Sequence, residues 1–329
     1  MAGIATSQDQ PTKNIGTRAE TTTGGENGSA AAGVPLALLS AAAFALSGSF
    51  ATSLFRTGWS PGAAVTVRIL TAAAIVTPPG LLAARGKWPA IRANAVSVIL
   101  FGLLAVAGAQ LFFFNAVQSL SVGVALMLEY MGLILVVLWQ WLVAGHRPGR
   151  NTVIGVGLAI VGLALVLDLF GAAKVDVIGI LWGLGAAVGL ATYYVVAGSG
   201  IRDIPPITMT GAGMVIGGLS LGVAGLLGAL PMAVSTDDVE LAGSSFPWFV
   251  AVGALGLVTG ALAYSSGVVA AGRLGAKLSA FVGLTEVLFA VVFAWILLGQ
   301  LPEGTQLVGG VFIVAGIAVV RREELRGSH

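Results

Sequence analysis

The sequence contains no cysteine, only two histidines and few charged residues of either sign. The absence of cysteine excludes disulfide frameworks, thiolate zinc sites and thiol chemistry. The histidines are His146 and the last residue, His329, so they offer no cluster that would hold a metal ion. We predict neither a metal site nor a cofactor. Charged residues make up 9% of the chain, whereas soluble domains contain about 25%.

Hydrophobic residues dominate what is present. They account for 57% of the 329 residues, and the mean hydropathy is +0.97. This composition is typical of an integral membrane protein. The net charge of +2 and the pI near 9.2 do not indicate a nucleic-acid partner, because the positions of the basic residues are explained by membrane topology.

A bilayer core is crossed by about 20 apolar residues of helix, with a range of about 17 to 25. The sequence offers ten such segments, and we predict an all-α membrane protein with ten transmembrane helices. The predicted spans are residues 34–55, 62–83, 94–116, 122–144, 152–169, 176–198, 206–229, 247–271, 276–299 and 304–320.

Lysine and arginine orient the spans, because cytoplasmic loops retain positive charge during insertion. With the N-terminus inside, 13 of the 16 basic residues fall on the cytoplasmic side. Residues 1–33 are polar and small and contain no apolar run, so we predict a disordered cytoplasmic tail. Residues 321–329 form a second cytoplasmic tail. The richness in Ala, Gly and Val suggests a GC-rich bacterium, and hence the inner membrane.

The two halves of the sequence resemble each other. Aligning Gly145 with Gly299 also aligns Pro148 with Pro302, and a glycine-rich helix follows each proline. This shift of 154 residues predicts two five-helix repeats, residues 34–170 and 171–320. Because five is odd, the second repeat enters the membrane in the opposite sense. Inverted repeats of this kind are typical of secondary transporters, whose substrate site lies near the midplane.

Three ionisable residues lie within spans: Arg68, Glu129 and Glu286. A charge at a helix centre costs about 2.5–3.5 kcal/mol on insertion scales, so such residues usually face the bundle interior and carry function. The shift of 154 places Glu286 on Gly132, three residues from Glu129 and on the same helical face. Arg68 and Glu129 either form an ion pair or act separately. Glu286 has no basic partner left over, so it is either a proton carrier or a neutral packed acid.

Polar and aromatic residues in neighbouring spans are further candidates for a substrate or proton pathway. Small-molecule sites combine apolar and aromatic walls with a few polar groups. The candidates are Gln110, Asn115, Tyr130, Trp182, Tyr193, Tyr264 and Ser266. Serine in a span more often bonds its own backbone or a neighbouring helix than a ligand.

Several of these features together resemble a known family. Arg68, "LEYMG" at Leu128–Gly132 and "LTEVLFAVVFAWILLGQ" at Leu284–Gln300 resemble EamA-type transporters of the drug/metabolite transporter superfamily, over residues 34–320. The stretch "ALMLEYMG" is most similar to the threonine and homoserine exporter branch, which reads Leu-Glu-aromatic-x-Gly here. The family commonly has proline where this chain has Leu133 and Val287, and frequently glutamate at Gln300. The resemblance implies a substrate-pathway role for the helix of Glu129.

We therefore predict a secondary transporter that exports small amino acids or related metabolites, driven by protons or by exchange. Two halves would alternate around a cavity containing Glu129 and Glu286, with Arg68 orienting Glu129 or holding a substrate carboxylate. A broad exporter of drugs or aromatic compounds is the alternative, which the aromatic run Phe112–Phe114 allows. The predicted partners are a small-molecule substrate and the lipid bilayer. A monomer and a homodimer both stay open.

The sequence does not favour two other classes of protein. A membrane enzyme acting on lipid-linked substrates would need clustered Asp, His or Arg residues at a membrane face, and the acids Asp237, Asp238 and Glu240 stand in a loop without histidine. A scaffold or receptor would not need carboxylates inside two corresponding spans. We therefore predict a protein that is not an enzyme.

Overall fold

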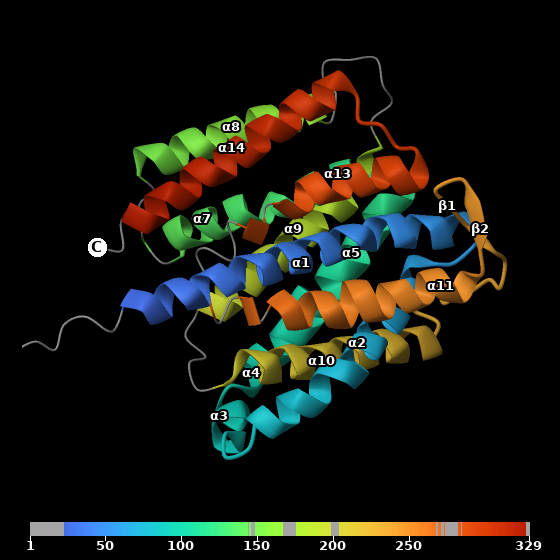
Figure 1. Cartoon of the computed structure of the whole chain (residues 1–329), viewed down its shortest axis with the longest axis horizontal. Helices are drawn as coiled ribbons and strands as arrows, with labels where there is room; N and C mark the ends of the chain where they lie inside the picture. The colour runs from blue at the N-terminus through green and yellow to red at the C-terminus, as the bar shows by residue number, and fades with distance from the viewer. Residues whose placement is uncertain are drawn as a thin grey trace, which may run out of the picture.

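The computed structural model describes residues 23–143, 145, 149–166, 176–198, 204–267, 269–270, 273, 282–283 and 285–326 (Figure 1). Most of the predicted N-terminal tail and the last three residues of the C-terminal tail lie outside this part of the chain. The first half contains the helical elements α1 (Thr23–Arg56), α2 (Pro61–Ala83), α3 (Trp88–Ala93), α4 (Ala95–Leu100), η1 (Phe101–Gly108), α5 (Ala109–Ser119), α6 (Val122–Tyr130), α7 (Gly132–Leu142) and α8 (Arg150–Val166).

The second half is also helical, apart from a short hairpin. Its elements are α9 (Val177–Gly198), α10 (Pro206–Leu226), β1 (Val239–Leu241), β2 (Ser244–Phe246), α11 (Trp248–Gly253), η2 (Ala254–Leu262), α13 (Thr285–Leu298) and α14 (Gly304–Arg326). The elements η1 and η2 are π-helical. They interrupt the helices of the third and eighth predicted spans.

Helix boundaries follow local capping chemistry. Ser60 caps α2, because its side chain accepts a hydrogen bond from the backbone N–H of Ala63 at 3.3 Å, and Pro61 follows in the first helical position. Ser121 caps α6 in the same way. Gly299 has a φ of +69° directly after α13, a conformation that glycine adopts without steric cost and that ends a helix.

Within the described residues, five helices are long and apolar enough to cross a membrane. They are Gly33–Arg56, Pro61–Ala83, Ala95–Ser119, Pro206–Leu226 and Trp248–Gly267. Shorter apolar helices are Val122–Val136, Arg150–Leu165, Val177–Tyr193, Thr285–Leu298 and Gly304–Gly316. All ten fall within or overlap the predicted spans, and the number of crossings stays a prediction. The helix α1 begins at Thr23, so it extends into the segment predicted as a disordered tail, where Ala30, Ala31 and Ala32 favour helix.

The helices are arranged in a slab with one close pair at each side (Figure 1). The pair α8 and α14 lies along one side, and the pair α2 and α10 lies along the opposite side. Between these pairs, α5 packs against α9, and α1 packs against α13 and η2. Each partner in the two outer pairs comes from a different half of the chain.

Small residues allow close approach at the centre of the slab. A Cβ built on Gly189 of α9 would lie 2.6 Å from the Cα of Ala109 in α5. A glycine at such a position lets the two backbones come together in an apolar environment.

We expect Gly189→Ala to lower the free energy of unfolding by about 1–3 kcal/mol, because the new methyl group would displace backbone. Gly222→Ala in α10 is the matched control, since nothing lies within 4 Å of a Cβ built there. The control should keep its stability or gain up to about 1 kcal/mol, because alanine favours helix over glycine. Thermal unfolding of the purified protein in detergent measures both. Equal melting temperatures would contradict the close α5–α9 contact.

The segment 229–247 covers the end of the bundle at which α1 ends. The strands β1 and β2 pair antiparallel, and β1 contacts α1 and α13. The indole N–H of Trp59 donates to the carbonyl of Ser235 at 2.8 Å, and the N–H of Ala242 donates to the carbonyl of Leu297 at 2.9 Å. This end of the bundle is therefore closed by hydrogen bonds between distant parts of the chain.

Candidate functional site

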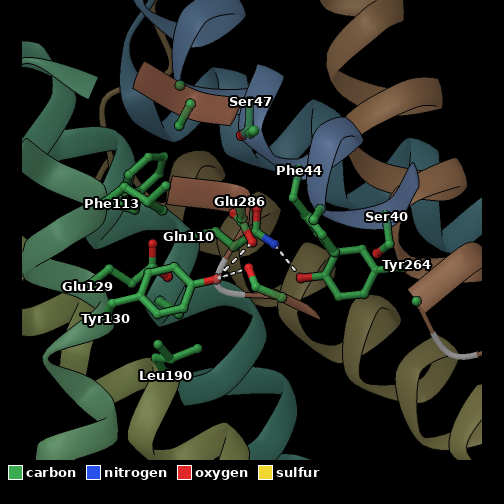
Figure 2. Close-up of a pocket in the computed structure, with 18 of the residues that line it drawn as sticks. Ser40, Phe44, Ser47, Gln110, Phe113, Glu129, Tyr130, Leu190, Tyr264 and Glu286 are labelled. Carbon is green, nitrogen blue, oxygen red and sulfur yellow. Dashed lines mark hydrogen bonds between the residues drawn. The ribbon is translucent and has the colours of Figure 1, made fainter. Parts of the chain in front are cut away.

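A cavity of about 330 Å³ lies at the centre of the bundle (Figure 2). Its walls come from α1, α2, α5, α6, α9, α10 and α13, together with η1 and the residues that follow η2. Seven of the ten predicted pathway residues line it: Arg68, Gln110, Glu129, Tyr130, Tyr193, Tyr264 and Glu286. The cavity extends along α1 from Ala37 to Gly48. Beyond it, Ala51 and Leu54 are fully buried.

Arg68 is the cation of the cavity, and its side chain is only 4% exposed. One terminal nitrogen, Nη2, donates to the carbonyl of Thr259 in η2 at 3.1 Å, and the guanidinium lies 5.5 Å from the ring centroid of Phe114. Its Nε–H is buried without a hydrogen-bond partner among the described residues. A buried donor without a partner is costly, so this nitrogen is suited to receive a ligand oxygen.

Arg68 and Glu129 do not form the ion pair that the sequence left open as one alternative. Within the described part of the chain, no carboxylate forms an ion pair with Arg68, whose polar contact is the carbonyl of Thr259. Glu129 and Glu286 nonetheless lie near enough to Arg68 for direct Coulomb interaction. Among the described residues, the cavity therefore holds one positive and two potentially negative groups that are not bound to one another.

Glu129 lies at a break between two helices. The helix α6 ends at Tyr130, α7 begins at Gly132, and the N–H of Met131 donates to the carbonyl of Leu128 at 3.1 Å, three residues back. This tighter turn interrupts the regular helical hydrogen bonding. Met131 keeps a right-handed helical backbone, with φ −59° and ψ −16°, so α6 and α7 follow each other with one tighter turn between them. The break occurs without a proline, since residues 131 to 133 are Met, Gly and Leu.

Tyr130 connects the carboxylate of the second half to α6. Its hydroxyl lies 3.1 Å from Oε2 of Glu286 and 3.1 Å from the carbonyl oxygen of Gly283 (Figure 2). Glu286 is in the first turn of α13 and is half-buried. The two predicted carboxylates therefore lie at one cavity, and Tyr130, the residue after Glu129, contacts the other carboxylate directly.

Gln110 and Tyr264 both line the cavity and bond to each other directly. Nε2 of Gln110 donates to the Tyr264 hydroxyl at 2.6 Å, and the two residues are 154 positions apart, which equals the predicted repeat shift. Each follows a π-helical segment, η1 or η2, by two residues. Oε1 of Gln110 is buried without a hydrogen-bond partner among the described residues. π-Helical turns are often found at functional sites, since they redirect side chains.

The first helix contributes a wall that sequence reasoning missed. Ser40, Phe44 and Ser47 point into the cavity, and the Phe44 ring meets Tyr264 edge-on at 4.7 Å (Figure 2). Ser47 is 4% exposed, and its hydroxyl has no hydrogen-bond partner in the described part of the chain. The spacing of these residues along α1 is that of one helical face, and this face alternates small and polar residues. That pattern is the signal that was available in the sequence.

Three predicted residues do not line the cavity. The amide of Asn115 donates to the carbonyl of Leu111 in its own helix at 2.7 Å, and the Ser266 hydroxyl donates to the carbonyl of Leu262 at 2.7 Å. Trp182 is 36% exposed and packs against Phe112. The backbone hydrogen bonds of Asn115 and Ser266 remove their polar groups from a ligand's reach. A pathway role for these two residues and for Trp182 stays a prediction without support from the cavity.

Comparison with known proteins explains this architecture. The model of the EamA-like transporter family matches two consecutive segments, residues 31–168 and 177–322. The chain belongs to the EamA-like transporter family. It is therefore an integral membrane protein and a transporter, not an enzyme.

Two individual proteins are similar to this chain. The uncharacterized transporter YyaM of Bacillus subtilis strain 168 is 26% identical over 266 residues, which cover 79% of this chain and 84% of that protein. One solved crystal structure aligns with a TM-score of 0.55 at 22% identity, over 92% of this chain and 99% of that one. At this identity the second likeness shows a shared fold and carries nothing about substrate.

Proposed function

We propose that this transporter exports small amino acids or related metabolites across the bacterial inner membrane, coupled to protons or to exchange. The main support for this proposal is the central cavity, in which a buried guanidinium and two carboxylates surround a space of about 330 Å³. Arg68 would receive the substrate carboxylate, and the carboxylates would receive its ammonium group or a proton. The similarity of "ALMLEYMG" to the threonine and homoserine exporters favours substrates of that size.

The proposed architecture is ten membrane spans in two inverted five-helix repeats. Three observations support it. The family model matches twice along the chain, both π-helical segments occupy equivalent positions, and Gln110 and Tyr264 meet at a separation equal to the repeat shift. The helix contacts agree: α8 with α14 and α2 with α10 each join equivalent helices, and the contact of η1 with α9 is matched by that of η2 with α1.

The proposed orientation places both termini in the cytoplasm, on the positive-inside rule. The cavity then extends along the cytoplasmic half of α1, and the hairpin closes the opposite end. A substrate would enter from the cytoplasm and leave by rocking of one half against the other, which is the direction that export requires.

A direct test is stabilisation of the purified protein by candidate substrates. A ligand that binds only the folded state stabilises it by about 2.7 kcal/mol at a concentration of 100 Kd. We expect threonine and homoserine to raise the melting temperature and the corresponding amino alcohols, which lack the carboxylate, to have no effect. If no amino acid stabilises the protein, and none exchanges across proteoliposomes, the proposed substrate class is wrong.

Aromatic compounds or drugs form the second candidate class. The observation that favours them is the aromatic lining, with Phe44, Phe113, Tyr130, Tyr193 and Tyr264 all at the cavity. Phenylalanine and a cationic aromatic drug therefore belong in the same panel. Stabilisation by the drug but by none of the amino acids would select this class.

A further inference from the structure

Tyr130 occupies a position that joins the two halves of the transporter. It belongs to α6, while Glu286 and Gly283 belong to the second half, and both contacts of its hydroxyl measure 3.1 Å. The helix α6 ends at Tyr130. The contact therefore ties the helix break beside Glu129 to the first turn of α13.

The chemistry of this contact depends on a proton. A phenolic hydroxyl has one proton to donate, and it also accepts. The carbonyl of Gly283 only accepts, and an ionised Glu286 also only accepts, so the hydroxyl then serves one of them. A protonated Glu286 donates to the phenolic oxygen and leaves the hydroxyl proton for Gly283. Both hydrogen bonds form at once only when Glu286 carries its proton.

We propose that Tyr130, Gly283 and Glu286 form a proton-dependent clasp between α6 and α13, in which Tyr130 is a positioning residue for Glu286. The inference rests on the proposed function, because it names the group through which protons would be coupled to transport. When the proton leaves Glu286 for the cavity water, one of the two hydrogen bonds is lost. The bond to the ionised carboxylate is charge-assisted and stronger, so the bond released is the one to Gly283, and the chain that leads into α13 is freer to move away from the helix break.

The surrounding charges are consistent with this clasp. The ionisable groups at the cavity are Arg68 from α2, Glu129 and Tyr130 from α6, Tyr193 from α9, and Tyr264 after η2. The lining residues of α1 include none, and β1, which also contacts α13, carries the exposed Glu240. With Glu129 ionised and Glu286 protonated, Arg68 and Glu129 balance each other, and the charges of the described cavity residues cancel. Loss of the proton leaves one net negative charge, which an incoming ammonium group would neutralise.

Hydrogen exchange of the full-length protein in detergent, without substrate, tests the clasp. Amides in residues 122–135 and 285–290 should be better protected at low than at high pH, after correction for intrinsic exchange, by about fivefold, as expected for one hydrogen bond. Glu286→Gln should keep the low-pH protection at all pH values, because its amide N–H replaces the acid proton. Tyr130→Phe should give low protection at all pH values.

Tyr264→Phe is the matched control, because it removes a cavity hydroxyl that bonds Gln110 instead of Glu286. It should leave the pH dependence of these two segments as in the wild type. Protection that is independent of pH in the wild type, or a pH dependence that survives in Tyr130→Phe, would overturn the clasp. Since no substrate is present, this outcome is separate from any failure of the amino-acid panel.

Discussion

Replacing Arg68 with methionine is expected to remove binding of carboxylate substrates while leaving the protein folded. Methionine fills a similar volume, and the cavity carboxylates that lose their cation can each take up a proton and become neutral, so the variant should keep its fold. The substrate carboxylate, however, would lose its charge-assisted partner at the free Nε–H. Such losses are about 2–5 kcal/mol, so substrate affinity should fall on the order of a hundredfold. Thermal shift and exchange across proteoliposomes measure the two effects separately.

The ligand itself supplies the control for this prediction. An amino acid and its amino alcohol differ in the carboxylate, so the two proteins and two ligands form a double-mutant cycle that isolates the interaction. The wild type should strongly prefer the amino acid, and Arg68→Met should not discriminate. Arg68→Lys keeps the charge but loses the planar fork held by Thr259 and Phe114, so it should lie between them. Equal discrimination by all three proteins would show that Arg68 is structural.

Much of the fold could be predicted from the sequence because it depends on patterns that extend over many residues. Apolar segments, turn residues and the internal repeat are all set by many residues, and the apolar helices fall where the hydropathy places them. The hairpin β1–β2 was not predicted, since its two strands are three residues each. Segments that short carry no clear periodicity.

The site was predictable to the extent that charge is unusual in a membrane. Arg68, Glu129 and Glu286 stood out for that reason, and the structure brings them to one cavity. The serines of α1 did not stand out, because serine in a membrane helix usually bonds its own backbone. The π-helical segments were equally invisible, since a shift from i−4 to i−5 bonding leaves the hydrophobic pattern almost unchanged. Sequence spacing also could not reveal which polar residues would pair across the halves, as Gln110 and Tyr264 do.

Replacing Glu129 with glutamine is expected to abolish concentrative transport. Glu129 lies next to the break at Met131, and its carboxylate forms no hydrogen bond or ion pair with the described residues. Its carboxylate is therefore suited to exchange between a proton and a substrate ammonium group, and an amide cannot serve in that exchange. Uptake and exchange in proteoliposomes, with and without a pH gradient, measure the loss. Glu303→Gln alters an exposed residue and should transport normally.

The charge balance of the cavity separates a transport role for Glu129 from a merely neutralising one. Glu129→Gln leaves Arg68 as an uncompensated buried cation when Glu286 is protonated, so the free energy of unfolding should fall by a few kcal/mol. The double variant Arg68→Met/Glu129→Gln removes both charges and should regain that stability. Because Arg68→Met by itself weakens substrate binding, transport by the double variant is compared with that of Arg68→Met. A further loss on adding Glu129→Gln would show that Glu129 handles substrate or proton. Transport equal to that of Arg68→Met would instead show that Glu129 serves only to balance Arg68.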